Sequence, residues 1–343
     1  MDLTIVGAGA IGGITGAHLA RAGHHVQLVE KDREHAEAIR REGLQIGGKS
    51  EFSVRVPVFF PDEVPGPIEV LILAVKTLYT REALEPLVPL LSKDGYVVSM
   101  QNGLEEAKIA TLVGSQRTVG AFLTFGGYFD RPGRLIYSGP GSLRVGELNG
   151  RITPRLQALA QVLSDFHPAE PTNNIQGFLW GKLVLSTMYF ATATVDADVV
   201  DILARPECRK VLAELVGEAL RVADALGIRV EPVDGFTAAA LRRGADTPEA
   251  LAAWEAQVAY WNRGVSRRTG VWRDLAVRRR RTEAGPILGA LVDAAKAAGF
   301  AVPQAQRLVQ AIHEIEEGRR RMDWANLTEI GSSRPSTRTS GSR

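Results

Sequence analysis

The chain has 343 residues, of which 45% are hydrophobic, so it is long enough to bury the cores of about two domains. Its 41 basic and 39 acidic residues leave a formal charge of only +2, which argues against nucleic-acid and membrane-surface partners and favours a small molecule. One cysteine, Cys208, cannot form an internal disulfide, and no Cys/His cluster has metal-ligand spacing. We therefore predict a metal-free cytoplasmic protein, and we expect neither a leader nor a membrane span.

The first predicted element is a strand over 3–6 that runs directly into the glycine motif Gly7-Ala8-Gly9-Ala10-Ile11-Gly12. In a strand–turn–helix unit, Gly7 permits the tight turn, Gly9 lets the backbone approach a pyrophosphate, and Gly12 lets the helix pack against the sheet. A helix over 14–22 and a second strand over 26–30 complete the unit. This order predicts a nucleotide-cofactor site, with an ordinary strand-to-helix turn as the alternative.

The following segments continue the alternation of strands and helices. Strand signals occupy 54–60, 70–75 and 96–100, and a helix signal occupies 81–91. Continuous apolar runs separated by helices are typical of a parallel sheet that is covered on both faces. Short strands between Gly and Pro turns over 119–145 predict antiparallel strands that close the domain.

Beyond about residue 170 the strand signals nearly vanish and helical spacing takes over. The helical segments are 175–195, 206–226, 233–243, 248–262, 287–298 and 303–317. The predicted fold class is an α/β Rossmann domain over 1–170, with a doubly wound and mostly parallel sheet, followed by an all-α domain over 171–328. The small, polar and basic residues of 329–343 predict a disordered tail.

Three polar residues stand next to apolar elements. Lys76 and Asn102 each follow a predicted buried strand, and in a doubly wound sheet the ligand lies beyond these strand ends. Lys182 lies inside a strongly apolar helix, where an ammonium is costly to bury without a partner. The alternatives are a solvated lysine, an Asn-Gly turn, and a lysine that extends along the helix surface to water.

Ordered motifs along nearly the whole chain resemble the ketopantoate reductase family, the 2-dehydropantoate 2-reductases of the 6-phosphogluconate-dehydrogenase-like superfamily. The matching segments are Gly7/Gly9/Gly12, Val75-Lys76, Gln101-Asn102-Gly103, Gly181-Lys182-Leu183, Arg280-Arg281-Thr282-Glu283 and Val302-Pro303. The resemblance implies that Lys182 is the general acid at the substrate carbonyl and that Glu283 belongs to the substrate side of the active site. It also implies that Lys76 and Asn102 contact both cofactor and substrate.

Three positions depart from the family pattern on the substrate side. The family carries Asn four and eight residues after its catalytic lysine, where this chain has Ser186 and Phe190, and Gly270 aligns with a family Ser. Ser186 retains a hydroxyl that could donate a hydrogen bond to substrate, whereas Phe190 would enlarge the apolar share of the site. Because buried donors discriminate strongly between substrates, these changes leave ketopantoate itself open and favour a bulkier or less polar oxo compound.

The cofactor assignment is divided between two neighbouring residues. Family members generally prefer NADPH and carry a basic residue just past the second strand, where this chain has Lys31. Glu30 before it is the carboxylate expected to bind the ribose 2′-hydroxyl of NAD and to repel a 2′-phosphate. The prediction is NAD(P)H, with a slight preference for NAD, and a solvated loop is the alternative.

The expected activity is NAD(P)H-dependent reduction of a 2-oxo acid, in the manner of 2-dehydropantoate 2-reductase, which would place the protein in pantothenate biosynthesis. The alternatives are a reductase for another ketone or an imine, and a non-catalytic nucleotide-binding protein. The run of arginines at 278–281 has no aromatic platform beside it, so we interpret it as a solvated face with one or two residues near substrate rather than a nucleic-acid site. Helical domains of this family often dimerise, which leaves a homodimer open.

Overall fold

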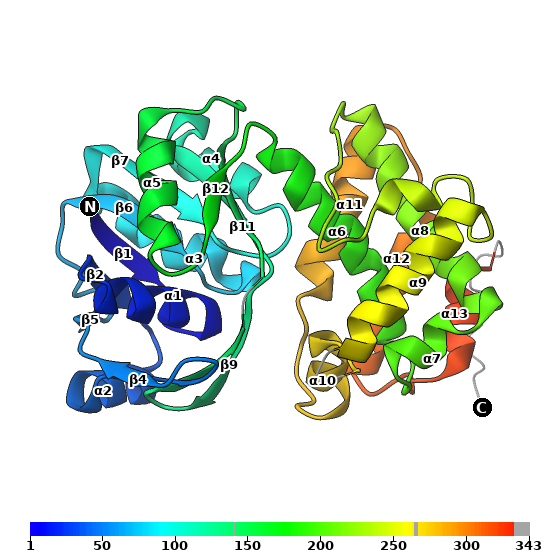
Figure 1. The fold of residues 1–343 in the computed structure, drawn as a ribbon, viewed down its shortest axis with the longest axis horizontal. Coiled ribbons are helices and arrows are strands. Elements are labelled where there is room, and N and C mark those ends of the chain that lie inside the picture. The colour runs from blue at the N-terminus through cyan, green and yellow to red at the C-terminus, as the bar shows by residue number, and fades with distance from the viewer. Residues whose placement is uncertain (140, 264–266, 333–343) are drawn as a thin grey trace, which may run out of the picture. The chain divides into compact units, whose positions relative to one another are not determined.

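The computed structural model describes residues 1–139, 141–263 and 267–332, and the chain divides into two compact units, Met1–Leu179 and Trp180–Arg343 (Figure 1). We call them unit 1 and unit 2. All strands among the described residues belong to unit 1, whereas the described part of unit 2 is helical apart from one isolated bridge between Val233 and Phe236. This architecture confirms the predicted fold class, a Rossmann-type α/β domain followed by an all-α domain.

The large sheet of unit 1 has eight strands in the order β12-β11-β8-β7-β6-β1-β2-β5. Every neighbouring pair is parallel except β8 and β11, so β11 and β12 run opposite to the rest. The strands are β1 (Asp2–Val6), β2 (His25–Val29), β5 (Val58–Phe59), β6 (Ile68–Leu73), β7 (Leu91–Ser99), β8 (Thr118–Leu123), β11 (Leu143–Glu147) and β12 (Ala169–Pro171).

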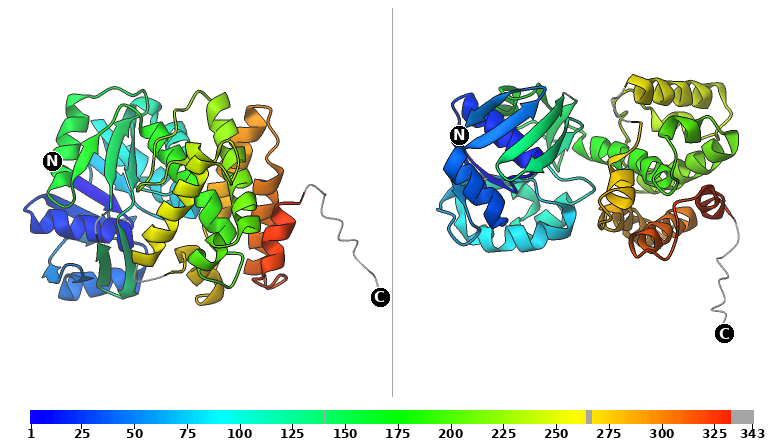
Figure 2. Two further views of the ribbon diagram at one scale, coloured as in Figure 1. Left: turned by 45° about the vertical axis from the view of Figure 1, so that its right-hand side comes forward. Right: turned by 90° about the horizontal axis from the view of Figure 1, so that it is seen from below.

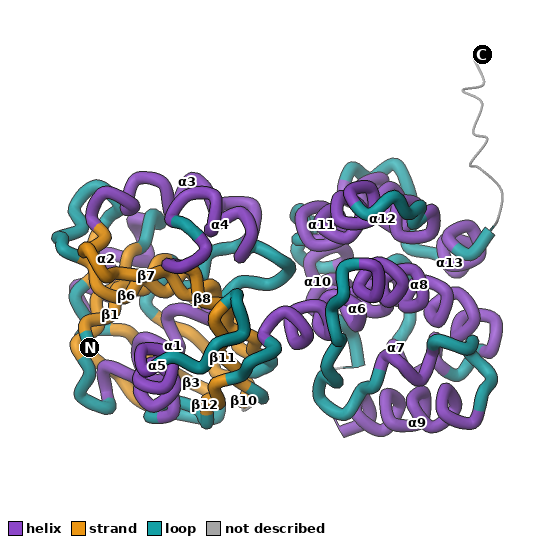
Figure 3. Tube along the Cα trace, turned by 90° about the horizontal axis from the view of Figure 1, so that it is seen from above, coloured by secondary structure: helices purple, strands orange, loops and turns teal. Residues whose placement is uncertain are grey.

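Helices cover both faces of this sheet (Figure 3). One face carries α1 (Ala10–Arg21) and α5 (Pro154–Ser164), and the other carries α3 (Thr80–Leu84) and α4 (Glu106–Val113). Alternate residues of β6 enter different cores: Val70 and Ile72 pack in one buried cluster, and Leu71 and Leu73 pack in the other. This double coverage explains why the β6 sequence is apolar without alternation.

A second, four-stranded sheet packs against α1. Its order is β4-β3-β10-β9, and Figure 2 shows its blue and green strands side by side although they are far apart in sequence. The helix lies so close that a Cβ on Gly13 would come within 2.5 Å of Leu135 Cδ1. The strands are β3 (Leu44–Gly48), β4 (Phe52–Val54), β9 (Gly126–Arg131) and β10 (Arg134–Gly139), and α2 (Arg33–Glu42) precedes them.

Two predicted elements of unit 1 are interrupted by proline. The strand expected over 54–60 is split into β4 and β5, with Pro57 between them. The helix expected over 81–91 is α3 followed by a 3₁₀ segment, η2 (Glu85–Leu90), which contains Pro86 and Pro89. Proline has no N–H to donate and clashes with the preceding turn, so neither element continues regularly.

The boundary between the units falls inside helix α6 (Ile175–Thr192) rather than at residue 170. The first turn of α6 packs against two glycines of the large sheet, Gly146 and Gly120. A Cβ on Gly146 would lie 2.5 Å from Ile175 Cβ, and one on Gly120 would lie 3.5 Å from Leu179 Cδ1. These glycines admit the helix to the sheet, which extends unit 1 to Leu179.

The remaining helices of unit 2 confirm most of the helical segments expected from the sequence. One expectation is wrong, because 233–243 contains only the short 3₁₀ helix η4 (Ala238–Leu241). The others are α7 (Val199–Leu203), α8 (Pro206–Ala225), α9 (Pro248–Arg263), α10 (Gly270–Ala276), α11 (Ala284–Ala297), α12 (Pro303–Glu316) and α13 (Trp324–Ile330). Helix α13 includes residues expected in the tail; the tail prediction for 333–343 falls outside the described residues.

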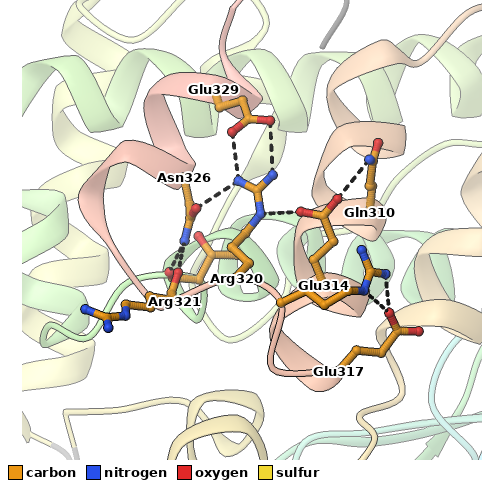
Figure 4. A network of polar contacts seen from close by, with 9 residues as sticks. Gln310, Glu314, Glu317, Arg320, Arg321, Asn326 and Glu329 are labelled. Carbon is orange, nitrogen blue, oxygen red and sulfur yellow. Dashed lines mark hydrogen bonds and ion pairs between the residues drawn. The ribbon is translucent and has the colours of Figure 1, made fainter. Parts of the chain in front are cut away.

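An ion network fixes α12 and α13 to the turn between them (Figure 4). Arg320 bonds Glu314 at 2.6 Å, Glu329 at 2.8 Å and Asn326 at 2.9 Å, and the side chains of Arg320 and Glu314 are only 8% and 11% exposed. Burial, the largest single influence, would raise the pKa of Glu314, but the hydrogen bonds from Arg320 and Gln310 and the nearby arginine charges together hold that pKa below its ordinary value. Within the described residues, no helix is both long and apolar enough to cross a membrane.

Candidate active site

The strand order brings the predicted cofactor residues of unit 1 to one edge of the large sheet. Strands β7, β6, β1 and β2 are neighbours, and the first three are continued by Asn102, Lys76 and Gly7, while Glu30 follows β2. Parallel strands end at the same edge, so these four residues share the crevice where doubly wound sheets bind their ligands. Lys76 is partly exposed and Asn102 is exposed, as residues at a ligand site must be.

The glycine loop has the shape that a dinucleotide requires. Gly7 has φ +93°, a left-handed conformation that favours glycine, and a Cβ on Gly12 would meet the Gly7 carbonyl oxygen at 2.2 Å. Gly9 has no atom within 4 Å of an added Cβ, so open space lies beside the backbone at the start of α1. That space and the N-terminal end of a 12-residue helix fit a pyrophosphate.

Two side chains hold the peptide groups of Ala8 in the middle of this loop. The Ala8 N–H donates to Glu30 Oε2 at 2.9 Å, and the ring of buried His35 bonds the Ala8 carbonyl oxygen through Nε2 at 2.9 Å. Because the Gly133 N–H donates to Nδ1 of the same ring at 3.0 Å, Nδ1 is the acceptor and Nε2 carries the proton. Glu30 and a neutral His35 therefore shape the loop from both sides.

A buried network ties together the two strand-end loops that carry Lys76 and Asn102. The Gln101 amide donates to the Val75 carbonyl oxygen at 3.0 Å and to Thr80 Oγ1 at 2.9 Å. Thr80 in turn donates to Glu105 Oε2 at 2.6 Å, and Lys108 pairs with Glu105 Oε1 at 2.7 Å. No sequence motif points to Thr80 or Glu105, because their partners are distant in the chain.

In unit 2, helix α6 presents one open stripe. From Trp180 to Phe190, all described, only Lys182, Ser186 and Tyr189 are not buried. They are spaced i, i+4 and i+7, which places them on one helix face. Phe190 is 4% exposed, so the expectation that it enlarges the apolar part of the site is wrong: its spacing from Lys182 turns its ring into the protein interior.

Ser186 and Tyr189 have different partners on this stripe. Ser186 Oγ donates to the Lys182 carbonyl oxygen at 2.7 Å, and its lone pairs can still accept a hydrogen bond; its role as a donor to substrate stays a prediction. The Tyr189 hydroxyl donates to Gln257 Oε1 at 2.7 Å, and its ring lies 5.3 Å from that of Trp261. Burial raises the pKa of Tyr189, which keeps it a neutral phenol. The i+7 spacing could have identified Tyr189 from sequence.

Glu283 is the residue immediately before α11, and it is partly exposed. Of the preceding arginines, Arg278 and Arg280 both bind the Asp274 carboxylate, at 2.9 and 3.0 Å. Their charges therefore pair with a residue of α10. Gly270 begins α10, where Thr269 caps the helix by accepting from the Trp272 N–H. Among residues 1–139, 141–263 and 267–332, no three His, Cys, Asp or Glu side chains form a group that could hold a metal.

Comparisons with known proteins match both units. Residues 3–150 match the ketopantoate reductase PanE/ApbA model, and residues 174–316 match the model of the C-terminal part of the same family. A 2-dehydropantoate 2-reductase of Pyrococcus abyssi is 30% identical over 246 residues, which cover 69% of this chain and 79% of that protein. The same enzyme of Archaeoglobus fulgidus is 29% identical, over 60% of its length.

Solved structures agree over a larger part of the chain. A D-mandelate dehydrogenase in complex with NADH and anilino(oxo)acetate has a TM-score of 0.79 at 25% identity, covering 93% of this chain and 99% of that one. A PanE/ApbA family ketopantoate reductase from Ralstonia eutropha JMP134 has a TM-score of 0.78 at 26% identity with the same coverage. The chain therefore belongs to the ketopantoate reductase family of NAD(P)-dependent oxidoreductases.

Proposed function

We propose that this protein reduces a 2-oxo acid with NAD(P)H, and that the first candidate reaction is conversion of 2-dehydropantoate to pantoate in pantothenate biosynthesis. The observation that carries the proposal is Lys182, a lysine with partial exposure in the middle of an otherwise buried segment of α6. Its partial exposure leaves the ammonium accessible to the carbonyl oxygen of a substrate. The named relatives support the choice of reaction.

In the proposed mechanism, bound NAD(P)H supplies a hydride to the carbonyl carbon. Lys182 donates a hydrogen bond to the carbonyl oxygen and then a proton, so that the C=O group becomes CH–OH without a free alkoxide. Lys76 and Asn102 orient cofactor and substrate from the strand-end loops that the Gln101–Thr80–Glu105 network holds. Glu283 binds on the substrate side.

A second candidate is a bulkier and less polar 2-oxo acid. The stripe on α6 carries Ser186, whose hydroxyl donates to the helix backbone, and then the aromatic Tyr189 beside Trp261. An aromatic wall favours a flat or branched apolar substituent over a hydroxylated one. The D-mandelate dehydrogenase with a similar fold was solved with anilino(oxo)acetate, a compound with an aromatic ring, which supports this candidate.

The test is a panel of 2-oxo acids that runs from 2-dehydropantoate to an aryl 2-oxo acid. An imine is added as a substrate of a different class. Initial rates of NADH and NADPH oxidation are followed in parallel. A kcat/KM for one 2-oxo acid that exceeds all others by at least about 100-fold is the expected result. Cofactor binding without turnover on any member would instead identify a non-catalytic nucleotide-binding protein.

The proposal also includes a cytoplasmic location and a homodimer. Cys208 is a buried free thiol, which suits the reducing cytoplasm. A homodimer through the helical unit stays a prediction, to be checked by light scattering of the full chain.

A further inference from the structure

The carboxylate of Glu30 is held in place by the backbone around it. Its Oε2 accepts the Ala8 N–H at 2.9 Å, and its Oε1 accepts the Asp32 N–H at 2.9 Å. Each oxygen keeps a second lone pair, so the group can still accept a ribose 2′-hydroxyl. It cannot turn away from a 2′-phosphate without giving up both backbone donors, so the phosphate would meet a fixed negative charge.

Lys31, the neighbouring cation, is drawn toward another part of the same edge. Its Nζ pairs with Glu82 Oε1 at 3.2 Å and lies 3.8 Å from the centre of the Tyr79 ring. Tyr79 and Glu82 belong to the segment that follows β6, whereas Lys31 follows β2, and β1 lies between these two strands. The lysine therefore reaches across the end of β1, away from its own loop.

The second basic residue of the loop is also engaged elsewhere. The guanidinium carbon of Arg33 lies 4.6 Å from the centre of the Phe60 ring. Asp32 accepts the His35 N–H as the cap of α2, so its carboxylate also stays at the loop. Lys31 and Arg33 thus both have partners away from the expected position of the ribose 2′-group, whereas the carboxylates of Glu30 and Asp32 remain beside that position.

We propose that the protein selects NADH over NADPH because the Glu30 carboxylate repels a 2′-phosphate. Glu82 and Tyr79 contribute to this selection by holding the Lys31 ammonium away from the position that the 2′-phosphate would take. This inference rests on the proposed function only in so far as it assumes a nicotinamide dinucleotide. Glu30 contributes most, since its charge is fixed and partly buried. The Lys31–Glu82 pair is exposed on both sides, so its share is small.

The test measures dissociation constants of NADH and NADPH by fluorescence titration of the full chain, with no carbonyl compound present. The wild type is expected to bind NADH at least about 30-fold more tightly. Glu30→Gln should reduce that ratio by about tenfold, and Glu82→Gln should tighten NADPH binding by about threefold while leaving NADH unchanged. Lys31→Ala should weaken NADPH binding less than about twofold in the wild type but should cancel the gain in Glu82→Gln.

The matched control is Glu85→Gln. Glu85 lies on the same segment and is 59% exposed, against 67% for Glu82, but it pairs with Arg81 at 3.3 Å and not with Lys31, so both constants should stay unchanged. Wild-type binding of NADPH as tight as that of NADH overturns the selection, and equal effects of Glu82→Gln and Glu85→Gln overturn the role of Glu82. NADH-selective binding without turnover sustains this inference and overturns the proposed function; binding of neither cofactor overturns both.

Discussion

The two units hold their functional residues in different ways. In unit 1, the cofactor residues stand on turns and strand ends whose backbone is constrained, as at Gly7 with φ +93° and Gly12 beside the Gly7 carbonyl. In unit 2, Lys182, Ser186 and Tyr189 stand on one face of a regular helix, where a side chain can be replaced without a change of backbone. The cofactor half is therefore restricted by geometry, and the substrate half is free to vary.

This difference accounts for the pattern of matches and departures along the chain. Family motifs occur in both units, at Gly7/Gly9/Gly12 and at Gly181-Lys182-Leu183, whereas two of the departures, at positions 186 and 190, lie on α6. A reductase can thus keep its hydride donor while its acceptor changes. Four substitutions test this contrast between the units, and they are given in order of decreasing expected effect.

Lys182→Ala should lower kcat by about 10²- to 10⁴-fold, because the carbonyl oxygen would lose its proton donor. The dissociation constant of NADH should change less than about twofold, since the proposed cofactor residues lie in unit 1. Steady-state rates and fluorescence titration measure the two effects separately. Lys296→Ala, an exposed lysine on α11, is the control and should change neither. Turnover near the wild-type rate would remove Lys182 from the mechanism.

Arg320→Leu should lower the free energy of unfolding by about 3 kcal/mol, because Glu314 would be left with little exposure and without its cation. Urea unfolding followed by circular dichroism measures the change. Arg319→Leu is the matched control: Arg319 pairs with Glu317 on the surface, with 61% and 50% exposed side chains, so its loss should cost less than about 1 kcal/mol. Equal costs for the two variants would contradict the role of burial.

Gly9→Ala should weaken NADH binding by about tenfold or more without lowering the unfolding temperature. An added Cβ at Gly9 meets no protein atom within 4 Å, so it would occupy only the space offered to the pyrophosphate. Gly12→Ala makes the contrast, since its Cβ would collide with the Gly7 carbonyl and should lower both stability and binding. Unchanged NADH affinity in Gly9→Ala would place the cofactor elsewhere.

Thr80→Val should reduce kcat/KM by about three- to tenfold, mainly through KM for the cofactor, since Gln101 and Glu105 would lose the hydroxyl that joins them. Thr80→Ser keeps that hydroxyl and should restore the wild-type value. Thr111→Val removes an exposed hydroxyl that bonds the Lys108 carbonyl oxygen and should have no effect. A loss of stability without a change in KM would make the network structural only.

Local patterns predicted most of the fold because they report local physics. The run Val70–Leu73 predicted a strand buried on both faces, and its residues do alternate between the two cores of unit 1. The segment 233–243 misled the prediction, because helical spacing over so few residues does not fix a helix against tertiary contacts. Strand signals over 54–60 likewise concealed the break at Pro57.

The position of several candidate residues at one sheet edge could be predicted, but their contacts could not. Gly7, Lys76 and Asn102 were identified because each follows a strand, and parallel strands end at one edge. The Thr80–Glu105 bond joins residues 25 apart in the chain, which no motif records. Phe190 was placed in the site by its offset from Lys182, and only the burial of its ring corrected this in favour of Tyr189.

The glycine turn, the doubly wound sheet and the helical second domain could be predicted from the sequence, because glycine geometry and hydrophobic periodicity are properties of neighbouring residues. The sequence did not decide between NAD, which Glu30 favours, and NADP, which Lys31 favours. The contacts of these two residues depend on the fold: the carboxylate accepts the Ala8 and Asp32 N–H groups, and the ammonium pairs with Glu82 beside the ring of Tyr79, both distant in the chain. Charges act through space, so their partners are known only once the chain is folded.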